Sequence, residues 1–138
     1  MRIENTKKWL RAGPRRNIFF DPSNVKAAIV TCGGLCPGLN VVIRELFMTL
    51  HYNYKVEEVY GIKYGYKGFY TYEWVKLDHE NVRNIHLEGG TMLGSSRGGF
   101  DLEKISNELI KRGINQVFCL GGDGTHKGVF ELFKEMRR

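Results

Sequence analysis

Two glycine-rich turns in this 138-residue chain carry the residues that are able to do chemistry. The first, Gly-Gly-Leu-Cys-Pro-Gly-Leu-Asn at residues 33–40, follows the apolar run 25–30. The second, Gly-Gly-Asp-Gly-Thr at residues 121–125, follows the apolar run 116–120. Each turn leads into a stretch with helical periodicity. Because a strand, a glycine turn and a helix N-terminus surround phosphate oxygens with backbone N–H groups, the sequence predicts a nucleotide or sugar-phosphate enzyme.

The second turn adds a carboxylate to this design. Gly121, Gly122 and Gly124 leave the main chain bare, so a phosphate can approach it closely. Asp123 would repel that phosphate unless Mg²⁺ lay between them, and Mg²⁺ is commonly bound by one or two carboxylates plus phosphate oxygens. We therefore predict Asp123 as a metal ligand and the Thr125 hydroxyl as a further donor. The alternative is an ordinary turn between strand and helix, with Asp123 as the helix cap.

Strand-like and helix-like patterns alternate around these turns. Strands are predicted at 25–30, 56–62 and 117–120. A helix is predicted after the first turn, where Leu39, Val42, Ile43, Leu46 and Leu50 form one apolar stripe. Two more helices are predicted, one between the cap Asp101 and the stop Gly113 and one from Lys127 onward. The fold class is therefore α/β, a Rossmann-like three-layer arrangement of a parallel sheet with flanking helices.

Charge and composition divide the chain in two. The net charge is +6, and residues 1–26 hold seven Lys and Arg against two acidic residues, which leaves the rest nearly neutral. We predict a basic, irregular N-terminal arm over 1–24 and an incomplete nucleotide-binding α/β domain over 25–138. RNA or membrane contact by the arm is the alternative to a solvated extension. No nucleic-acid motif is present and the apolar runs are too short for a bilayer, so neither partner is expected.

Cysteine usage suggests the compartment. The three cysteines are Cys32, Cys36 and Cys119, an odd number in a chain without a secretory signal. This pattern favours a reducing compartment, and we expect the cytoplasm. The basic N-terminus leaves a plastid or another organelle open. The spacing of Cys32 and Cys36 has no matching second pair, which argues against zinc.

The turns also resemble the motifs of a known family. Gly-Gly-Asp-Gly-Thr resembles a nucleotide motif shared by 6-phosphofructokinases, NAD kinases and diacylglycerol-type lipid kinases. Residues 31–44, 61–69 and 89–97 are similar, in the same order, to three further 6-phosphofructokinase motifs. The chain thus resembles the N-terminal part of that family over residues 13–138. The arm and the Cys-Gly-Gly-Leu-Cys-Pro-Gly-Leu-Asn form are more similar to the plant and protist branch than to the short bacterial enzymes.

The resemblance implies a role for each site residue. Gly34 would contact the donor phosphates through its backbone, and Arg97 with Gly98 would line the nucleotide site. The Arg97 guanidinium would bridge phosphates in the transition state, unless it is only a surface arginine on a flexible loop. The remaining nucleotide-binding residues would be Gly122, Asp123, Gly124 and Thr125, with Asp123 directed toward Mg²⁺. ATP as donor, fructose 6-phosphate as acceptor, allosteric control and homo-oligomers follow from the same resemblance.

Gly124 bears on the choice of donor. Pyrophosphate users of the family generally carry an aspartate at the matching position, where it opposes the α-phosphate of ATP. The glycine therefore predicts an ATP-dependent 6-phosphofructokinase, which forms fructose 1,6-bisphosphate in glycolysis. The alternatives are a pyrophosphate-dependent phosphofructokinase and a non-catalytic nucleotide-binding regulatory subunit.

Two further expectations complete the sequence interpretation. The family's catalytic base is an aspartate in a Thr-Ile-Asp-Asn-Asp segment, which does not occur in this sequence. We expect that the chain holds the donor-site motifs of a longer protein and is not active alone. Tyr66, Phe69 and Tyr70 form an aromatic loop that would either pack on an adenine ring or cover the sheet.

Overall fold

The computed structural model describes residue 13 and residues 15–137. Most of the predicted arm, residues 1–12 and 14, lies outside the described residues. Residues 15–21 form no helix or strand, and a 3₁₀ turn at Pro22–Asn24 follows. The Asp21 carboxylate caps that turn by accepting a 3.0 Å hydrogen bond from the Ser23 N–H. The regular fold therefore starts at the first strand.

The sheet has four strands in the order β3-β2-β1-β4. Their bounds are Lys26–Thr31 for β1, Glu58–Ile62 for β2, Val75–Lys76 for β3 and Gln116–Leu120 for β4. β1 pairs in parallel with both β2 and β4, with Ile29 opposite Gly61 and Phe118. The predicted parallel sheet is confirmed for these three strands. β3 runs antiparallel to β2, because residues 63–74 fold back through short helices instead of crossing over the sheet.

Three longer helices flank the sheet. They are α1 at Leu39–Met48, which continues as a π-helical turn at Thr49–Asn53, α4 at Leu102–Arg112 and α5 at Asp123–Met136. The predicted ends of α4 are confirmed: Asp101 accepts a hydrogen bond from the Lys104 N–H, and Gly113 ends the helix at φ 69°. α5 begins at Asp123, four residues before the apolar periodicity becomes visible. Short helical segments occupy much of the region between β2 and α4: Gly65–Lys67, Gly68–Thr71 (α2), His79–Val82 (α3) and Ile85–Leu87.

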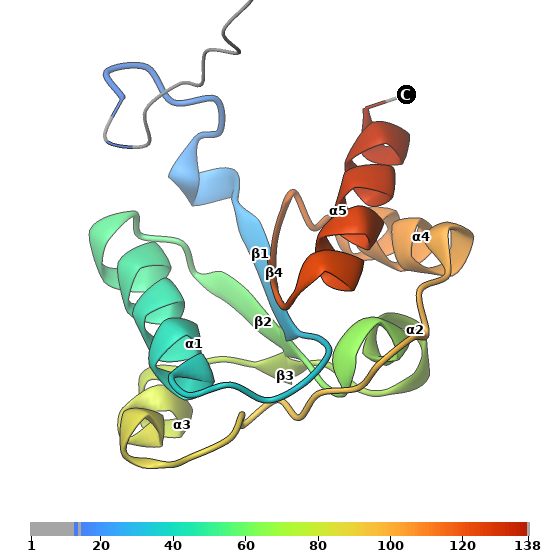
Figure 1. Ribbon diagram of the computed structural model, residues 1–138. Helices are drawn as coiled ribbons and strands as arrows, with labels where there is room; N and C mark the ends of the chain where they lie inside the picture. The colour runs from blue at the N-terminus through green and yellow to red at the C-terminus, as the bar shows by residue number, and fades with distance from the viewer. Residues whose placement is uncertain (1–12, 14, 138) are drawn as a thin grey trace, which may run out of the picture.

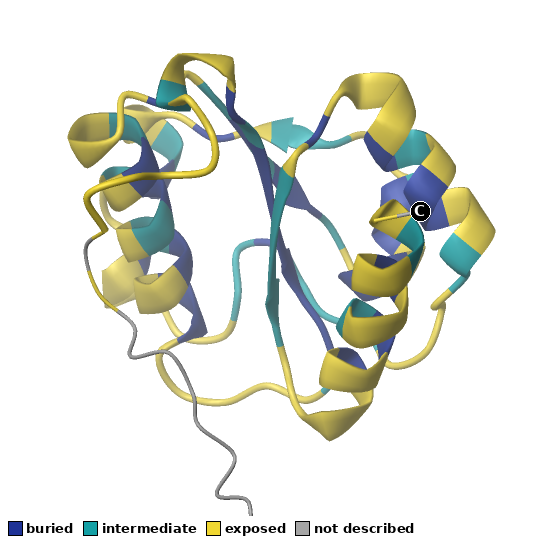
Figure 2. Cartoon of the chain, turned by 90° about the horizontal axis from the view of Figure 1, so that it is seen from above, coloured by how far each residue is buried: buried dark blue, intermediate teal, exposed yellow. Residues whose placement is uncertain are grey.

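The helices form two layers, with the sheet between them (Figure 1). α1 covers one face, where Ala27 and Ile29 of β1 pack with Ile43 and Phe47. α4 and α5 cover the other face, where Ala28 and Val30 pack with apolar residues of both helices, Ile105, Leu109 and Leu132. Figure 2 shows buried and half-buried strands between helices whose outer sides are exposed. The three-layer α/β prediction is thus confirmed.

The buried face of α1 differs in one respect from the predicted stripe. Leu39, Ile43 and Leu50 are buried as expected, whereas Val42 is 42% exposed. Phe47 takes its place and is only 2% exposed. The face runs through Leu39, Ile43 and Phe47, which are spaced four residues apart and therefore lie nearly above one another. The rotation of the helix could not be read from a sequence with apolar residues on both sides of this line.

The chain order creates a crevice at the carboxyl end of the sheet. From β1 the chain passes through α1 to β2 on one side, while β4 lies on the other side of β1. At such a switch point the loops after adjacent strands diverge, and open α/β sheets bind their ligands there. Both glycine turns follow the two strands that flank this point. Within the described residues, no helix is long and apolar enough to cross a membrane.

Candidate functional site

A pocket of about 410 Å³ lies at the carboxyl ends of β1 and β4. Four segments distant in sequence form its wall: the turn after β1, Tyr66 of the loop after β2, the segment 96–100 and the start of α5. Its lining includes Cys32, Gly33, Gly34, Tyr66, Ser96, Arg97, Gly98, Phe100, Gly122, Gly124 and Thr125. The structure therefore brings together all the predicted site residues except Asp123, which is not part of the lining.

Arg97 lies next to the first glycine turn. A Cβ atom added to Gly34 would be 3.7 Å from Nη2 of Arg97, so the guanidinium lies beside the Gly34 main chain. Arg97 is exposed, and its side chain makes no hydrogen bond or ion pair with any residue that the structure describes. A guanidinium presents five N–H donors in a planar fork that matches phosphate oxygens. It is therefore free to bind an anion in the pocket.

Buried polar side chains of β1 and α1 hold the segment that leads to Arg97. Thr31, at the end of β1, donates a 2.6 Å hydrogen bond from its hydroxyl to the carbonyl of Gly94. Asn40 accepts one of 2.7 Å from the Met92 N–H and donates another to the carbonyl of Glu88. Both polar residues are buried. The sequence interpretation missed them, although a polar residue at the end of a buried strand and another beside an apolar stripe are recognisable signals.

The second glycine turn opens the start of α5 toward the pocket. Gly122 is the N-cap, has no side-chain cap and adopts an extended conformation. Asp123 is the first helical residue, so the alternative in which it caps the helix is wrong. A Cβ atom at Gly122 or Gly124 would meet no atom within 4 Å, which leaves space directly over the helix N-terminus. N–H groups and the helix dipole favour an anion in that space.

Gly121 and Thr125 pack tightly beneath this opening. A Cβ atom at Gly121 would lie 2.2 Å from the Thr125 hydroxyl oxygen and 2.8 Å from the Cys32 carbonyl oxygen, so only glycine fits there. Thr125 is 6% exposed, and its hydroxyl lies within hydrogen-bond reach of the Cys32 thiol. Thr125 thus lines the pocket, but its hydroxyl contacts the protein.

Two thiols lie near the pocket: Cys32 is buried and Cys119 is half-buried. Burial raises the pKa of Cys32 to about 11, although hydrogen bonds from the Tyr66 backbone and the Thr125 side chain act against this shift. Burial, together with the neighbouring Cys32, raises the pKa of Cys119 to about 12. Both thiols are therefore neutral near pH 7 and add no negative charge beneath a bound phosphate. Cys36 in the first turn is exposed.

Asp123 is the residue predicted to hold a metal ion. It is exposed and its carboxylate has no hydrogen-bond or ion-pair partner among the described residues. The same residues contain no group of three or more His, Cys, Asp or Glu that could hold a metal. This donor set matches Mg²⁺ that arrives on phosphates and takes one protein carboxylate, and it does not match an all-protein metal cage.

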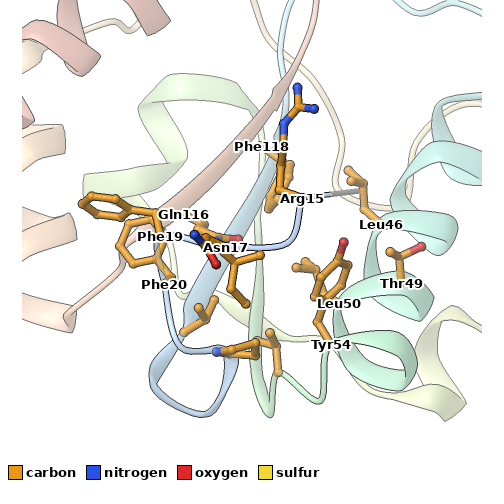
Figure 3. A pocket seen from close by; sticks show the side chains of 14 residues that line it. Arg15, Asn17, Phe19, Phe20, Leu46, Thr49, Leu50, Tyr54, Gln116 and Phe118 are labelled. Carbon is orange, nitrogen blue, oxygen red and sulfur yellow. The ribbon is translucent and has the colours of Figure 1, made fainter. Parts of the chain in front are cut away.

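A larger pocket of about 590 Å³ lies at the opposite end of the strands (Figure 3). Residues of the segment 15–22 line one side, Leu46, Leu50 and Tyr54 line another, and Phe118 lies between them. The wall is mainly apolar and contains no glycine turn and no N-terminus of a described α-helix. The smaller pocket is therefore the candidate phosphate site, despite its size.

Comparisons with known proteins agree with this assignment of the fold. The family model described as Phosphofructokinase matches residues 26–138. Over 126 residues the chain is 58% identical to ATP-dependent 6-phosphofructokinase 2 of Arabidopsis thaliana. The matched region covers 91% of this chain and 28% of that protein. Over 129 residues it is 46% identical to ATP-dependent 6-phosphofructokinase of Entamoeba histolytica, covering 92% and 30% respectively.

A solved phosphofructokinase structure has the same fold. The phosphofructokinase of Pichia pastoris in the T-state matches with a TM-score of 0.74 and 27% identity, over 83% of this chain and 13% of that one. The chain spans less than a third of the length of each relative described above. The family model nevertheless covers most of the chain, and the relatives include a plant and a protist protein. The chain therefore belongs to the phosphofructokinase family.

Proposed function

We propose that this chain is the donor-binding part of an ATP-dependent 6-phosphofructokinase. The complete protein would transfer the γ-phosphoryl group of ATP to fructose 6-phosphate and form fructose 1,6-bisphosphate. One observation carries the proposal: the Arg97 guanidinium, the Gly34 main chain and the start of α5 face one pocket. Phosphoryl transfer needs mainly positioning and charge neutralisation, which an arginine, backbone N–H groups and a helix N-terminus supply.

The site residues would have different roles in donor binding. Gly34, Gly98 and Gly122 would let donor phosphates approach the main chain, and Arg97 would neutralise the charge that develops on the transferred group. Asp123 would hold Mg²⁺, which when bound neutralises the phosphate oxygens. Open space at Gly124 leaves room for the α-phosphate of a nucleotide, and this supports ATP over pyrophosphate.

The acceptor site and its catalytic base would come from the rest of the protein. The domain proposed for residues 25–138 has an open side that fits this division. No strand of the described residues pairs with the outer edge of β4, and all five β4 residues are only half-buried. Nearby on α5, Phe130 and Phe133 are 57% and 53% exposed. In parallel sheets both faces are normally covered, so we propose that the remaining sheet and its helices pack here.

The proposal extends to the partners and the cellular compartment. We propose ATP and fructose 6-phosphate as substrates, a homo-oligomer as the assembly, and no nucleic-acid or membrane partner. The three cysteines are free, as in a reducing compartment, which supports the cytoplasm or a plastid.

A donor-swap assay tests the proposed function. The full-length protein that contains this chain is supplied with fructose 6-phosphate and either MgATP or Mg-pyrophosphate, and formation of fructose 1,6-bisphosphate is followed. The expected result is turnover with MgATP that exceeds turnover with pyrophosphate. Turnover with pyrophosphate alone contradicts the ATP assignment, and nucleotide binding without turnover favours a regulatory subunit.

A further inference from the structure

We propose that Tyr66 is a positioning residue for the donor site, which acts by fixing the first turn of α5. The inference rests on the proposed function of the pocket. Tyr66 belongs to the loop after β2, a third strand that supplies neither glycine turn. Its effect would pass through the backbone of Thr125 to the N-terminal N–H groups of α5.

The Tyr66 hydroxyl is bonded to the backbone of that turn. It donates a 2.6 Å hydrogen bond to the Thr125 carbonyl. Tyr66 is 4% exposed, so no water replaces this bond easily. Because a buried hydrogen bond does not compete with water, this contact fixes the orientation of the turn more firmly than an exposed hydrogen bond would.

An unusual glycine makes this contact possible. Gly128 lies inside α5, where glycine is unfavourable relative to alanine. A Cβ atom there would lie 2.9 Å from the Tyr66 hydroxyl oxygen and 2.9 Å from a ring carbon of Phe100. The glycine therefore allows both aromatic side chains to approach the helix. Its position in the helix interior has no other explanation in the packing.

Burial decides what the aromatic loop does. Tyr66 and Phe69 are 4% and 1% exposed and belong to the core, so in this structure they cover the sheet and are not free to stack on an adenine ring. The Tyr66 ring packs edge-on against Phe100, with ring centroids 5.0 Å apart. Phe100 itself lines the donor pocket.

The same loop also contacts the segment that carries Arg97. The Tyr70 hydroxyl donates a 3.0 Å hydrogen bond to the carbonyl of Gly99, and the Ser96 hydroxyl donates one to the carbonyl of Tyr64. A Cβ atom at Gly65 would lie 2.8 Å from the Ser96 hydroxyl oxygen, so this approach is equally close. The loop therefore contacts two walls of the pocket, one through Tyr66 and the other through its neighbours.

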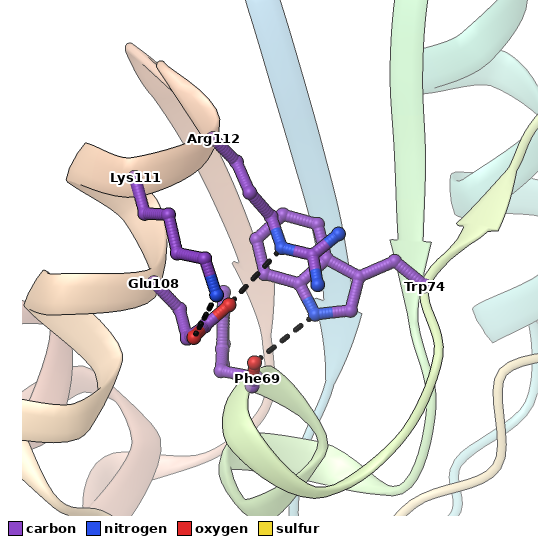
Figure 4. A network of polar contacts seen from close by, with 5 residues as sticks. All are labelled: Phe69, Trp74, Glu108, Lys111 and Arg112. Carbon is purple, nitrogen blue, oxygen red and sulfur yellow. Dashed lines mark hydrogen bonds and ion pairs between the residues drawn. The ribbon is translucent and has the colours of Figure 1, made fainter.

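A cluster at the far end of the loop holds it on α4 (Figure 4). The Trp74 indole N–H donates a 3.1 Å hydrogen bond to the Phe69 carbonyl. The Arg112 guanidinium lies over the indole ring at 4.2 Å, and Glu108 accepts a 3.2 Å hydrogen bond from Nε of the same arginine. With both ends anchored, the position of the Tyr66 hydroxyl is determined by the scaffold.

The test compares Tyr66→Phe with Tyr52→Phe in the full-length protein. Both variants lose one hydroxyl, but the Tyr52 hydroxyl contacts His79 at 2.9 Å and does not line the donor pocket. Three quantities are measured: the Kd for MgATP by calorimetry, the KM for each substrate, and amide hydrogen exchange of residues 121–130 without nucleotide.

For Tyr66→Phe we expect faster exchange in the first turn of α5. The Kd and KM for MgATP should rise by about tenfold, with the KM for fructose 6-phosphate unchanged. Tyr52→Phe should match the wild type in all three. Faster exchange with unchanged MgATP affinity means a structural role only and overturns the inference, as does no change at all. Failure of the wild type to bind MgATP instead overturns the proposed function.

Gly128→Ala tests the role of the Tyr66 hydroxyl independently, by adding a Cβ atom on α5 next to it. The added methyl group would displace the Tyr66 hydroxyl without removing it, so the same rise in the Kd for MgATP is expected in the folded variant. If circular dichroism shows a native fold and the affinity equals that of the wild type, the close approach of Tyr66 is not what positions the turn.

Discussion

Ser95 donates a 2.7 Å hydrogen bond from its hydroxyl to the carbonyl of Gly33, although the two residues are 62 positions apart in the sequence. The contact is reciprocated by the main chain, because the Gly33 N–H donates to the carbonyl of Ser96 at 2.9 Å. These bonds join the first glycine turn to the segment that carries Arg97. The position of the arginine over Gly34 thus depends on a direct connection between two loops.

Replacement of this hydroxyl should weaken donor binding. In Ser95→Ala the Gly33 carbonyl loses a part-buried partner, which costs about 1 kcal/mol, and the KM for MgATP should rise about threefold to tenfold. Steady-state kinetics of the full-length protein measures the change. Ser23→Ala is the control, because its hydroxyl hydrogen-bonds only to the exposed Asp21. Equal KM values for the two variants would contradict the connection.

Removal of the Asp123 carboxylate should reduce turnover through lost magnesium positioning. We expect Asp123→Ala to lower kcat with MgATP by about 100-fold, the size seen when one transition-state stabiliser is lost. Glu131→Gln is a matched control on the same helix, where the carboxylate is exposed and paired only with Lys134 at 3.0 Å. Measurement over a range of Mg²⁺ concentrations checks the role. Unchanged kinetics at limiting Mg²⁺ would show that Asp123 does not hold the metal.

An aspartate at position 124 should change the preference between donors. Because the added side chain enters open space, Gly124→Asp should fold normally, while its charge opposes the extra phosphate of a nucleotide. The KM for ATP is expected to rise more than the KM for pyrophosphate. Gly89→Asp also enters open space, lies outside the pocket, and should change neither value. Equal losses with both donors would mean that residue 124 does not select the donor.

The thiols of Cys32 and Cys119 should make the fold sensitive to alkaline pH. The pKa values of Cys32 and Cys119 are about 11 and about 12 in the folded chain, above the ordinary value of 9.0. Between pH 9.0 and the raised pKa of each thiol, the unfolded chain loses the thiol proton while the folded chain keeps it. The free energy of unfolding therefore falls as pH rises in that range, by up to about 1.4 kcal/mol per pH unit for each thiol. Below pH 9.0 this contribution is fully present.

Urea unfolding at several alkaline pH values measures that slope. Cys119→Ala should give a shallower decline than the wild type, and Cys36→Ala, which removes an exposed thiol, should not. Native alkylation gives a second readout: the exposed Cys36 should react first and the buried Cys32 only after unfolding. Equal slopes in both variants would contradict the raised pKa of Cys119, and rapid alkylation of Cys32 would contradict its burial.

Local signals made much of the fold predictable. Asp101 and Gly113 mark the ends of α4 because a cap and a left-handed stop act on neighbouring residues. β1 was recognisable because a strand covered on both faces is apolar without alternation. β3 was not predicted, because two residues, Val75 and Lys76, carry no periodicity. The start of α5 was placed late because Asp123 to His126 include glycine and polar residues.

The site was predictable only in its residue types. The two glycine turns indicated phosphate chemistry and the family resemblance added Arg97, but the convergence of Gly34, Arg97 and Gly124 depends on the strand order, which no local pattern encodes. The contact between Tyr66 and α5 was missed for the same reason. Gly128 was the one visible sign, since a glycine inside a helix indicates close packing by a partner that only the structure identifies.

The assignment of the donor pocket is tested most directly by mapping where MgATP binds. Backbone amide chemical shifts of this chain, labelled with nitrogen-15, are followed during a titration with MgATP. Glycine amides resolve well, and Gly33, Gly34, Gly98, Gly122 and Gly124 all line the pocket. The largest shifts are expected at these five glycines. Shifts concentrated around Leu46, Leu50 and Phe118 in the larger pocket, or no shifts at saturating MgATP, would contradict the central claim.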